Sequence, residues 1–186
     1  MSGAVCPWWL GYFIAAPWRR LWQDPRTLLR PFITEGVTVL EPGPGMGFFT
    51  LEAARLVGPK GHVVAVDIQP RMLETLRRRA GRAGVLERID ARLAQGEGMG
   101  VDDLDGRVDF VLAFAVVHEL PDAGRFFIEA HRVMKPGARL LLAEPRMHVS
   151  EAAFAATLRL AEGAGLEIQD RPSISMSRSA TLARKN

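Results

Sequence analysis

The stretch Val37-Thr-Val-Leu-Glu-Pro-Gly-Pro-Gly-Met-Gly47 decides how this 186-residue chain is expected to fold. Its apolar beginning, Val37–Glu41, predicts a buried strand, and glycines at alternate positions follow before a helical pattern starts. A glycine-rich turn between a strand and a helix lets a ligand approach the backbone closely, because glycine has no side chain and adopts positive φ angles. The glycines alone indicate a nucleotide-like ligand and do not identify it.

Beyond this loop, apolar strand patterns alternate with helical patterns up to Ala143, which is typical of a parallel sheet covered by helices. Besides the first strand, the patterns predict strands at 62–67, 89–93, 108–114 and 138–143 and helices at 48–56, 70–81, 123–134 and 151–161. Residues 166–170 and 179–184 then form two strand patterns joined by a short Pro/Ser-rich connection. The sequence therefore predicts an α/β fold whose parallel sheet ends in an antiparallel hairpin.

The bulk composition is that of an ordinary globular protein, with 48% hydrophobic and 24% charged residues. No apolar run reaches the roughly 20 residues that a membrane-spanning helix needs. The net charge of +3 is small and spread along the chain, which disfavours a nucleic-acid partner but leaves it open. No basic region precedes the apolar N-terminal stretch, and Cys6 is the only cysteine. A cytoplasmic location is therefore the expectation.

Two acidic residues flank the glycine loop in positions that suit a ligand. Glu41 ends the first strand, where a carboxylate is poorly placed to face a pyrophosphate and well placed to bind an ammonium group. Asp67 ends the second strand, where an acidic side chain accepts both hydroxyls of a ribose. Ile68 beside it suits one face of an adenine ring. The alternative for Asp67 is an aspartate that caps the following helix.

Several segments together resemble the class I S-adenosylmethionine-dependent methyltransferases. The family's first motif is similar to Val37-Thr-Val-Leu-Glu-Pro-Gly-Pro-Gly-Met-Gly-Phe-Phe-Thr50. Its second motif is similar to Val63-Val-Ala-Val-Asp-Ile68, and its turn into the fifth strand is similar to Met134-Lys-Pro-Gly-Ala-Arg-Leu-Leu-Leu142. Gln95-Gly96-Glu97 resembles the Gly-Asp segment after the third strand, with Glu97 in place of the usual aspartate. Val108-Asp-Phe-Val-Leu-Ala-Phe114 with His118-Glu-Leu-Pro-Asp122 looks like the fourth motif of small-molecule and quinone methyltransferases.

The resemblance implies a doubly wound, mostly parallel seven-stranded sheet of the Rossmann-like methyltransferase type, with S-adenosylmethionine as the methyl donor. From the methionine end to the adenine end, the cofactor-binding residues that it implies are Glu41, Gly43, Gly45, Gly47, Asp67, Ile68 and Glu97, with Gln95 as an alternative to Glu97. Phe114 and Ala115, at the end of the fourth strand, are implied to line the sulfonium end.

His118 is the catalytic candidate, because a histidine just past the fourth strand lies near the expected point of methyl transfer and takes a proton near neutral pH. The alternative is a polar group that fixes the loop through Glu119 or a backbone carbonyl. Methyl transfer from a sulfonium can also proceed largely by positioning the reactants in line. No metal is expected, because His62, His131 and His148 lack metal-ligand spacing with one another or with Cys6.

Residues 1–36 form an aromatic-rich segment that we expect to be a helical cap on the methyltransferase domain at residues 37–186. Trp8, Trp9, Tyr12 and Phe13 recur in it at helical spacing. One interpretation is that they pack the segment onto the sheet edge. The other is that they line a hydrophobic acceptor pocket, or contact a membrane surface or a second copy of the chain in a homodimer.

The sequence therefore favours a methyltransferase that acts on a small acceptor, and the aromatic N-terminal segment would suit an apolar one. A protein or RNA acceptor is the alternative within the same class, and a cofactor-binding protein without catalysis is the alternative outside it. A nicotinamide-dependent oxidoreductase is less favoured, because it needs a donor-rich loop facing a pyrophosphate and a second domain for its substrate.

Overall fold

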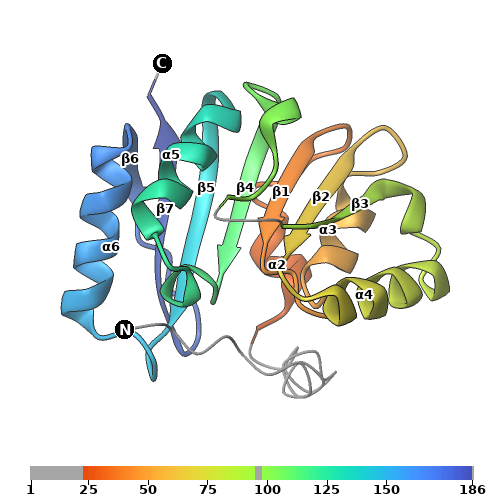
Figure 1. Ribbon diagram of the computed structural model, residues 1–186, viewed down its shortest axis with the longest axis horizontal. Coiled ribbons are helices and arrows are strands. Elements are labelled where there is room, and N and C mark those ends of the chain that lie inside the picture. The colour runs from red at the N-terminus through yellow and green to blue at the C-terminus, as the bar shows by residue number, and fades with distance from the viewer. Residues whose placement is uncertain (1–22, 95–97, 186) are drawn as a thin grey trace. The chain divides into compact units, whose positions relative to one another are not determined.

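The computed structural model describes residues 23–94 and 98–185 (Figure 1). Its strands form a seven-stranded sheet in the order β3-β2-β1-β4-β5-β7-β6. The last strand along the chain, β7, runs antiparallel to both β5 and β6. The predicted α/β fold, with a mostly parallel sheet that ends in an antiparallel hairpin, is confirmed. This part of the chain divides into two compact units, an N-terminal unit of residues 23–94 and a C-terminal unit of residues 98–185.

The N-terminal unit contributes three parallel strands, β1 (Thr38–Pro42), β2 (His62–Asp67) and β3 (Ile89–Leu93). Its helical elements are α2 (Pro25–Leu29), α3 (Thr50–Leu56), α4 (Pro70–Arg82) and the short 3-10 helix η3 (Leu86–Arg88). The first two strands are buried along most of their length, as expected for β-branched runs inside a parallel sheet. α4 packs on β2 and β3, and Pro70 occupies its first turn, where a missing N–H costs nothing.

The C-terminal unit holds the other four strands, β4 (Val108–Phe114), β5 (Met134–Pro145), β6 (Leu166–Asp170) and β7 (Ser177–Arg184). Its helical elements are η4 (Asp102–Leu104), η5 (Val117–Glu119), α5 (Ala123–Val133) and α6 (Glu151–Gly163). β4 pairs in parallel with β5, while α6 packs against both α5 and β6. Phe110, Phe127 and Phe154 are the largest fully buried side chains of its core.

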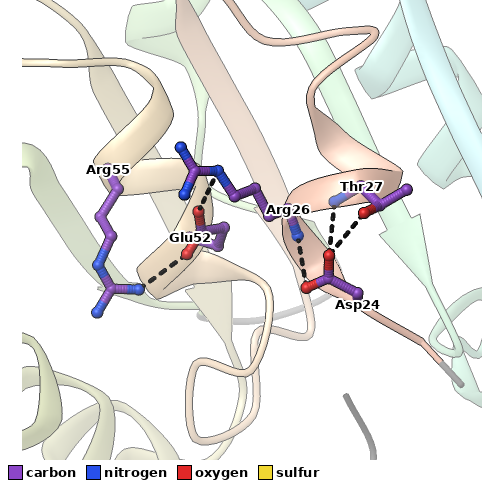
Figure 2. A network of polar contacts seen from close by, with 5 residues as sticks. All are labelled: Asp24, Arg26, Thr27, Glu52 and Arg55. Carbon is purple, nitrogen blue, oxygen red and sulfur yellow. Dashed lines mark hydrogen bonds and ion pairs between the residues drawn. The ribbon is translucent and has the colours of Figure 1, made fainter. Parts of the chain in front are cut away.

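A polar network ties α2 to α3, the helix that follows the glycine loop (Figure 2). Asp24 caps α2, because its carboxylate accepts the Thr27 N–H at 3.1 Å, the Thr27 hydroxyl at 2.6 Å and the Arg26 N–H at 3.4 Å. The Arg26 Nε lies 3.8 Å from Glu52 Oε1, and Arg55 Nη1 lies 2.9 Å from Glu52 Oε2. Glu52 of α3 therefore joins an arginine of each helix.

Several elements differ from the sequence prediction at their ends, and two of them show why. The helix expected at 48–56 begins at Thr50, because Phe48 and Phe49 occupy the preceding turn with their rings edge to face, 5.1 Å apart. The fifth strand, expected at 138–143, spans Met134–Pro145 because its pairing extends from Met134 opposite Val108 to Pro145 opposite Ser177. Among the described residues, no helix combines the length and apolar character needed to cross a membrane.

Candidate active site

The glycine loop of the N-terminal unit follows β1 and has the backbone that glycine allows. Gly43, Gly45 and Gly47 have φ angles of 64°, 53° and 84°. A Cβ atom added at Gly45 meets nothing within 4 Å, so the space beside this residue is open. A Cβ atom added at Gly47 would overlap Leu76 Cδ1 of α4, so the absence of a side chain at Gly47 lets the loop pack closely on the helix. The loop thus combines an open position with a tightly packed one.

Glu41 is buried at the end of β1, with only 4% of its surface exposed. Its Oε2 and the Thr50 hydroxyl have no hydrogen-bond partner within residues 23–94 and 98–185. Burial raises the pKa of Glu41 to about 7; nearby Thr50 opposes this shift without reaching hydrogen-bond geometry, and the charge of Asp67 adds to it. A buried carboxylate with an unpaired oxygen is costly, so Glu41 is poised to accept a cationic or hydrogen-bond-donating partner.

Asp67 ends β2 and links that strand to the glycine loop. Its Oδ2 accepts the Gly45 N–H at 3.3 Å, and its Oδ1 accepts the Gln69 N–H at 2.8 Å. The second bond goes to the N–H of Gln69, the residue that precedes α4, so Asp67 contacts the approach to the helix without capping it. Ile68 is 56% exposed, unlike most residues of its size and apolarity. The structure therefore brings Glu41, Gly45 and Asp67 together within one unit.

The loop after β4 carries the predicted residues of the C-terminal unit. Phe114 and Ala115 are half-buried, and the Ala115 N–H donates to the Ala143 carbonyl at 2.7 Å. Ala115 has a φ angle of 55°, which is uncommon for a residue with a side chain and marks a locally strained turn. Strain of this kind concentrates at sites where the chain must hold a special geometry.

His118 is held by Glu144, the penultimate residue of β5. The His118 Nδ1 hydrogen-bonds with Glu144 Oε2, while Glu144 Oε1 accepts the Val117 N–H at 2.8 Å. Glu119, which the sequence suggested as a partner, lies farther away, with its Oε1 3.9 Å from His118 Nε2. The hydrogen bond with Glu144 raises the pKa of His118; burial opposes this, and the charges of Glu144 and Glu119 add to the rise.

The comparisons with known proteins identify the family of the chain. Residues 33–171 match the model of a family described as "Methyltransferase domain". The chain belongs to this family. It is a class I S-adenosylmethionine-dependent methyltransferase domain.

A solved structure from Aquifex aeolicus, a SAM-dependent methyltransferase, superposes with a TM-score of 0.83 at 26% identity and covers 96% of this chain and 98% of its own. An arsenite methyltransferase from Halobacterium salinarum is 36% identical over 59% of this chain and 27% of its own length. A ubiquinone/menaquinone biosynthesis C-methyltransferase from Pasteurella multocida is 32% identical over 60% of this chain and 41% of its own. The chain thus spans less than half the length of these two curated relatives.

The residues of this methyltransferase domain fit S-adenosylmethionine, the methyl donor of the family. The Glu41 Oε2, unpaired among the described residues, has the chemistry to accept an ammonium group such as that of the donor's methionine part, and the loop has an open position at Gly45. The carboxylate of Asp67, which contacts the loop at the Gly45 N–H, has the chemistry to accept ribose hydroxyls. Over the described residues, His, Cys, Asp and Glu form no group of three or more that could hold a metal ion.

Some predicted residues lie outside the described part of the methyltransferase. These are Glu97, its alternative Gln95, and the aromatic residues Trp8, Trp9, Tyr12 and Phe13. Their roles remain predictions.

Sequence reasoning also missed two residues of this domain. Arg79 of α4 donates from Nη1 to the carbonyl of Met46, inside the glycine loop, although the arginine cluster that contains it resembles an ordinary solvated helix face. Glu144 holds His118, and the available signal was an acidic residue that directly follows the apolar run within β5, as Glu41 follows the apolar run within β1.

Proposed function

We propose that this chain transfers the methyl group of S-adenosylmethionine to a small acceptor molecule. The observation that carries the proposal is the carboxylate of Glu41, which is buried, has an unpaired oxygen among the described residues, and ends the strand before the glycine loop. Such a group is costly unless a ligand supplies the missing partner. An amino-acid ammonium group supplies it, whereas the pyrophosphate of a nicotinamide cofactor would be repelled.

The proposed binding roles follow the chain from β1 to β4. Glu41 and the glycines at 43, 45 and 47 hold the methionine part, Asp67 holds the ribose, and Ile68 covers one face of the adenine. Glu97 accepts the adenine amino group, and Phe114 with Ala115 lines the sulfonium end. The half-exposed apolar side chain of Ile68 supports its role, because it offers a flat ring a surface without charge.

The acceptor is proposed to be a small molecule because the relatives' names specify arsenite and quinone biosynthesis. Trp8, Trp9, Tyr12 and Phe13 are proposed to line its pocket, where aromatic side chains bind apolar rings by contact area. His118 is proposed to serve the acceptor as an acid–base group. Transfer of a methyl group from a sulfonium otherwise needs mainly in-line positioning. A protein or RNA acceptor, and binding of the cofactor without catalysis, are the alternatives.

Binding of S-adenosylhomocysteine, measured by titration calorimetry, tests the cofactor part of the proposal. Asp67→Ala should weaken binding by about 1–3 kcal/mol, because charge-assisted hydrogen bonds to the ribose are lost. Asp90→Ala is the matched control, since Asp90 lies on neighbouring β3 and its side chain is half-exposed and paired with Arg92. Equal affinity of wild type and Asp67→Ala would overturn the assignment of Asp67.

Methyl transfer itself is tested with S-adenosylmethionine carrying a labelled methyl group. The panel of acceptors is arsenite, a naphthohydroquinone, total RNA and a denatured protein extract. We expect label in one of the small molecules. Label in RNA or protein would select the alternative acceptor class, and tight binding of S-adenosylhomocysteine with no transfer to any of them would favour the non-catalytic alternative.

A further inference from the structure

Glu144 is a buried carboxylate that the cofactor assignments leave without a role. Only 1% of its surface is exposed, and it lies at the carboxyl end of β5 in the C-terminal unit. Both of its oxygens are occupied, one by the Val117 N–H at 2.8 Å and the other by His118 Nδ1. Glu144 therefore joins the end of β5 to the 3-10 helix η5 through two consecutive residues, the backbone of Val117 and the ring of His118.

This arrangement fixes the orientation and tautomer of His118. A carboxylate at Nδ1 keeps the proton on that nitrogen, so the neutral ring presents the lone pair of Nε2. The Nε2 atom lies 3.9 Å from Glu119 Oε1, which is beyond hydrogen-bond length. About 20% of the His118 side chain is exposed. The ring is thus anchored on one nitrogen and able to take a proton on the other.

The other charged groups around His118 do not duplicate the role of Glu144. The ring of His148, from the turn after β5, stands edge to face with that of His118 at 5.6 Å. At the start of α5, which packs against η5, Asp122 accepts the Arg125 N–H at 2.9 Å, and Arg125 pairs with Glu129 at 3.1 Å. Glu119 acts on His118 only through its charge. Glu144 is therefore the carboxylate in hydrogen-bond contact with the ring.

We propose that Glu144 is a positioning residue that holds His118 as a general base for an acceptor whose reacting atom carries a proton, such as a phenol or a hydroquinone. This inference rests on the proposed methyl transfer and names its acceptor class. His118 Nε2 takes the proton from the acceptor oxygen or carbon, and the electron pair left there forms the bond to the methyl carbon. The carbon–sulfur bond breaks with its electron pair remaining on sulfur, and the imidazolium then releases its proton to water.

The hydrogen bond between Glu144 and His118 also determines how the rate of methyl transfer should change with pH. Because the pKa of His118 is raised, the neutral ring that acts as a base predominates only above that raised pKa. The rate with a proton-bearing acceptor should therefore rise with pH through the raised value. Removing the carboxylate charge lowers the pKa of His118 and makes the ring a weaker base, so the profile moves to lower pH and its plateau falls.

An NMR titration tests the positioning step on the protein without methyl donor. The four histidines are resolved by ring ¹⁵N and ¹H shifts, and His118→Gln assigns the relevant signal. We expect neutral His118 to be the Nδ1–H tautomer and its titration to move to lower pH in Glu144→Gln. Glu119→Gln is the matched control and should shift it less. An Nε2–H tautomer in the wild type would overturn the proposal even if Glu144→Gln does not fold.

Kinetics with a naphthohydroquinone as acceptor test the catalytic step. Glu144→Gln should lower kcat by about 10- to 100-fold with little change in the KM for S-adenosylmethionine, and should move the pH profile to lower pH. An unmoved profile, or a loss confined to KM, would show that Glu144 only holds the loop. Failure of the methyl-transfer proposal is recognised separately, because it would remove turnover and leave the NMR result unchanged.

Discussion

Among single residues, Glu41 has the features most typical of a ligand-binding group. Its carboxylate is 4% exposed, one oxygen is unpaired among the described residues, and burial raises its pKa from 4.5 to about 7. A group of this kind weakens the folded state, because the charged form is better solvated in the unfolded chain. Perturbed carboxylates of this kind gather at functional sites, where a bound ligand compensates for them.

Because burying the charged form of Glu41 is unfavourable, the free energy of unfolding should depend on pH. A carboxyl whose folded pKa is raised contributes stability that is fully present below the unfolded pKa of 4.5 and is lost as pH rises through about 7. The Gln variant does not titrate. Relative to wild type, Glu41→Gln should therefore gain about 3 kcal/mol of unfolding free energy between pH 4 and pH 8. Urea unfolding at both pH values measures this difference, and a constant difference would contradict the assigned pKa.

The sequence predicts those residues of the site that lie at a strand end next to the glycine loop or within the loop. Glu41, Gly45 and Asp67 follow that rule, and the structure brings them together. The acidic residue at the end of the apolar run of β5 was visible in the sequence, but the contact of Glu144 with His118 was not, because the ring lies 26 residues earlier in the chain and only the pairing of β4 with β5 brings the two together. Arg79 was missed for the same reason, since its partner Met46 lies 33 residues away.

At the scale of helices and strands, the sequence predicted the elements better than their ends. Strand runs and the proline at the start of α4 are local signals, and the hairpin of β6 and β7 lies where the two terminal strand patterns occur. The ends depend on tertiary contacts. β5 is longer than its apolar run because both neighbouring strands continue to pair with it.

The side-chain cap of helix α2 is expected to stabilise the fold. Asp24→Ala removes the acceptor of the Arg26 and Thr27 N–H groups and of the Thr27 hydroxyl (Figure 2). It should lower the unfolding free energy by about 1 kcal/mol, which thermal or urea unfolding measures. Asp24→Asn is the control and should lose less, because its amide keeps one oxygen acceptor. Equal stability of all three proteins would show that the cap contributes nothing.

At the scale of the whole molecule, the sheet order and the family match over residues 33–171 identify the methyl donor. The acceptor was less predictable, because its specificity depends on side-chain shape contributed by several segments and on no local motif. In-line transfer needs positioning more than a fixed set of catalytic groups. The proposed pair of Glu144 and His118 narrows the acceptor by its chemistry, toward a reacting atom that carries a proton.

The proposed ion pair between the carboxylate of Glu41 and the ammonium group of the cofactor is tested by the number of protons released on binding. With a pKa of about 7, Glu41 is half protonated at pH 7 in the free protein, and an ammonium partner stabilises its charged form. Titration of S-adenosylhomocysteine at pH 7 in phosphate and in Tris, whose ionisation heats differ, measures the protons released. Wild type should release about half a proton more per ligand than Glu41→Gln. The same proton release in both proteins would show that Glu41 does not bind the ammonium group.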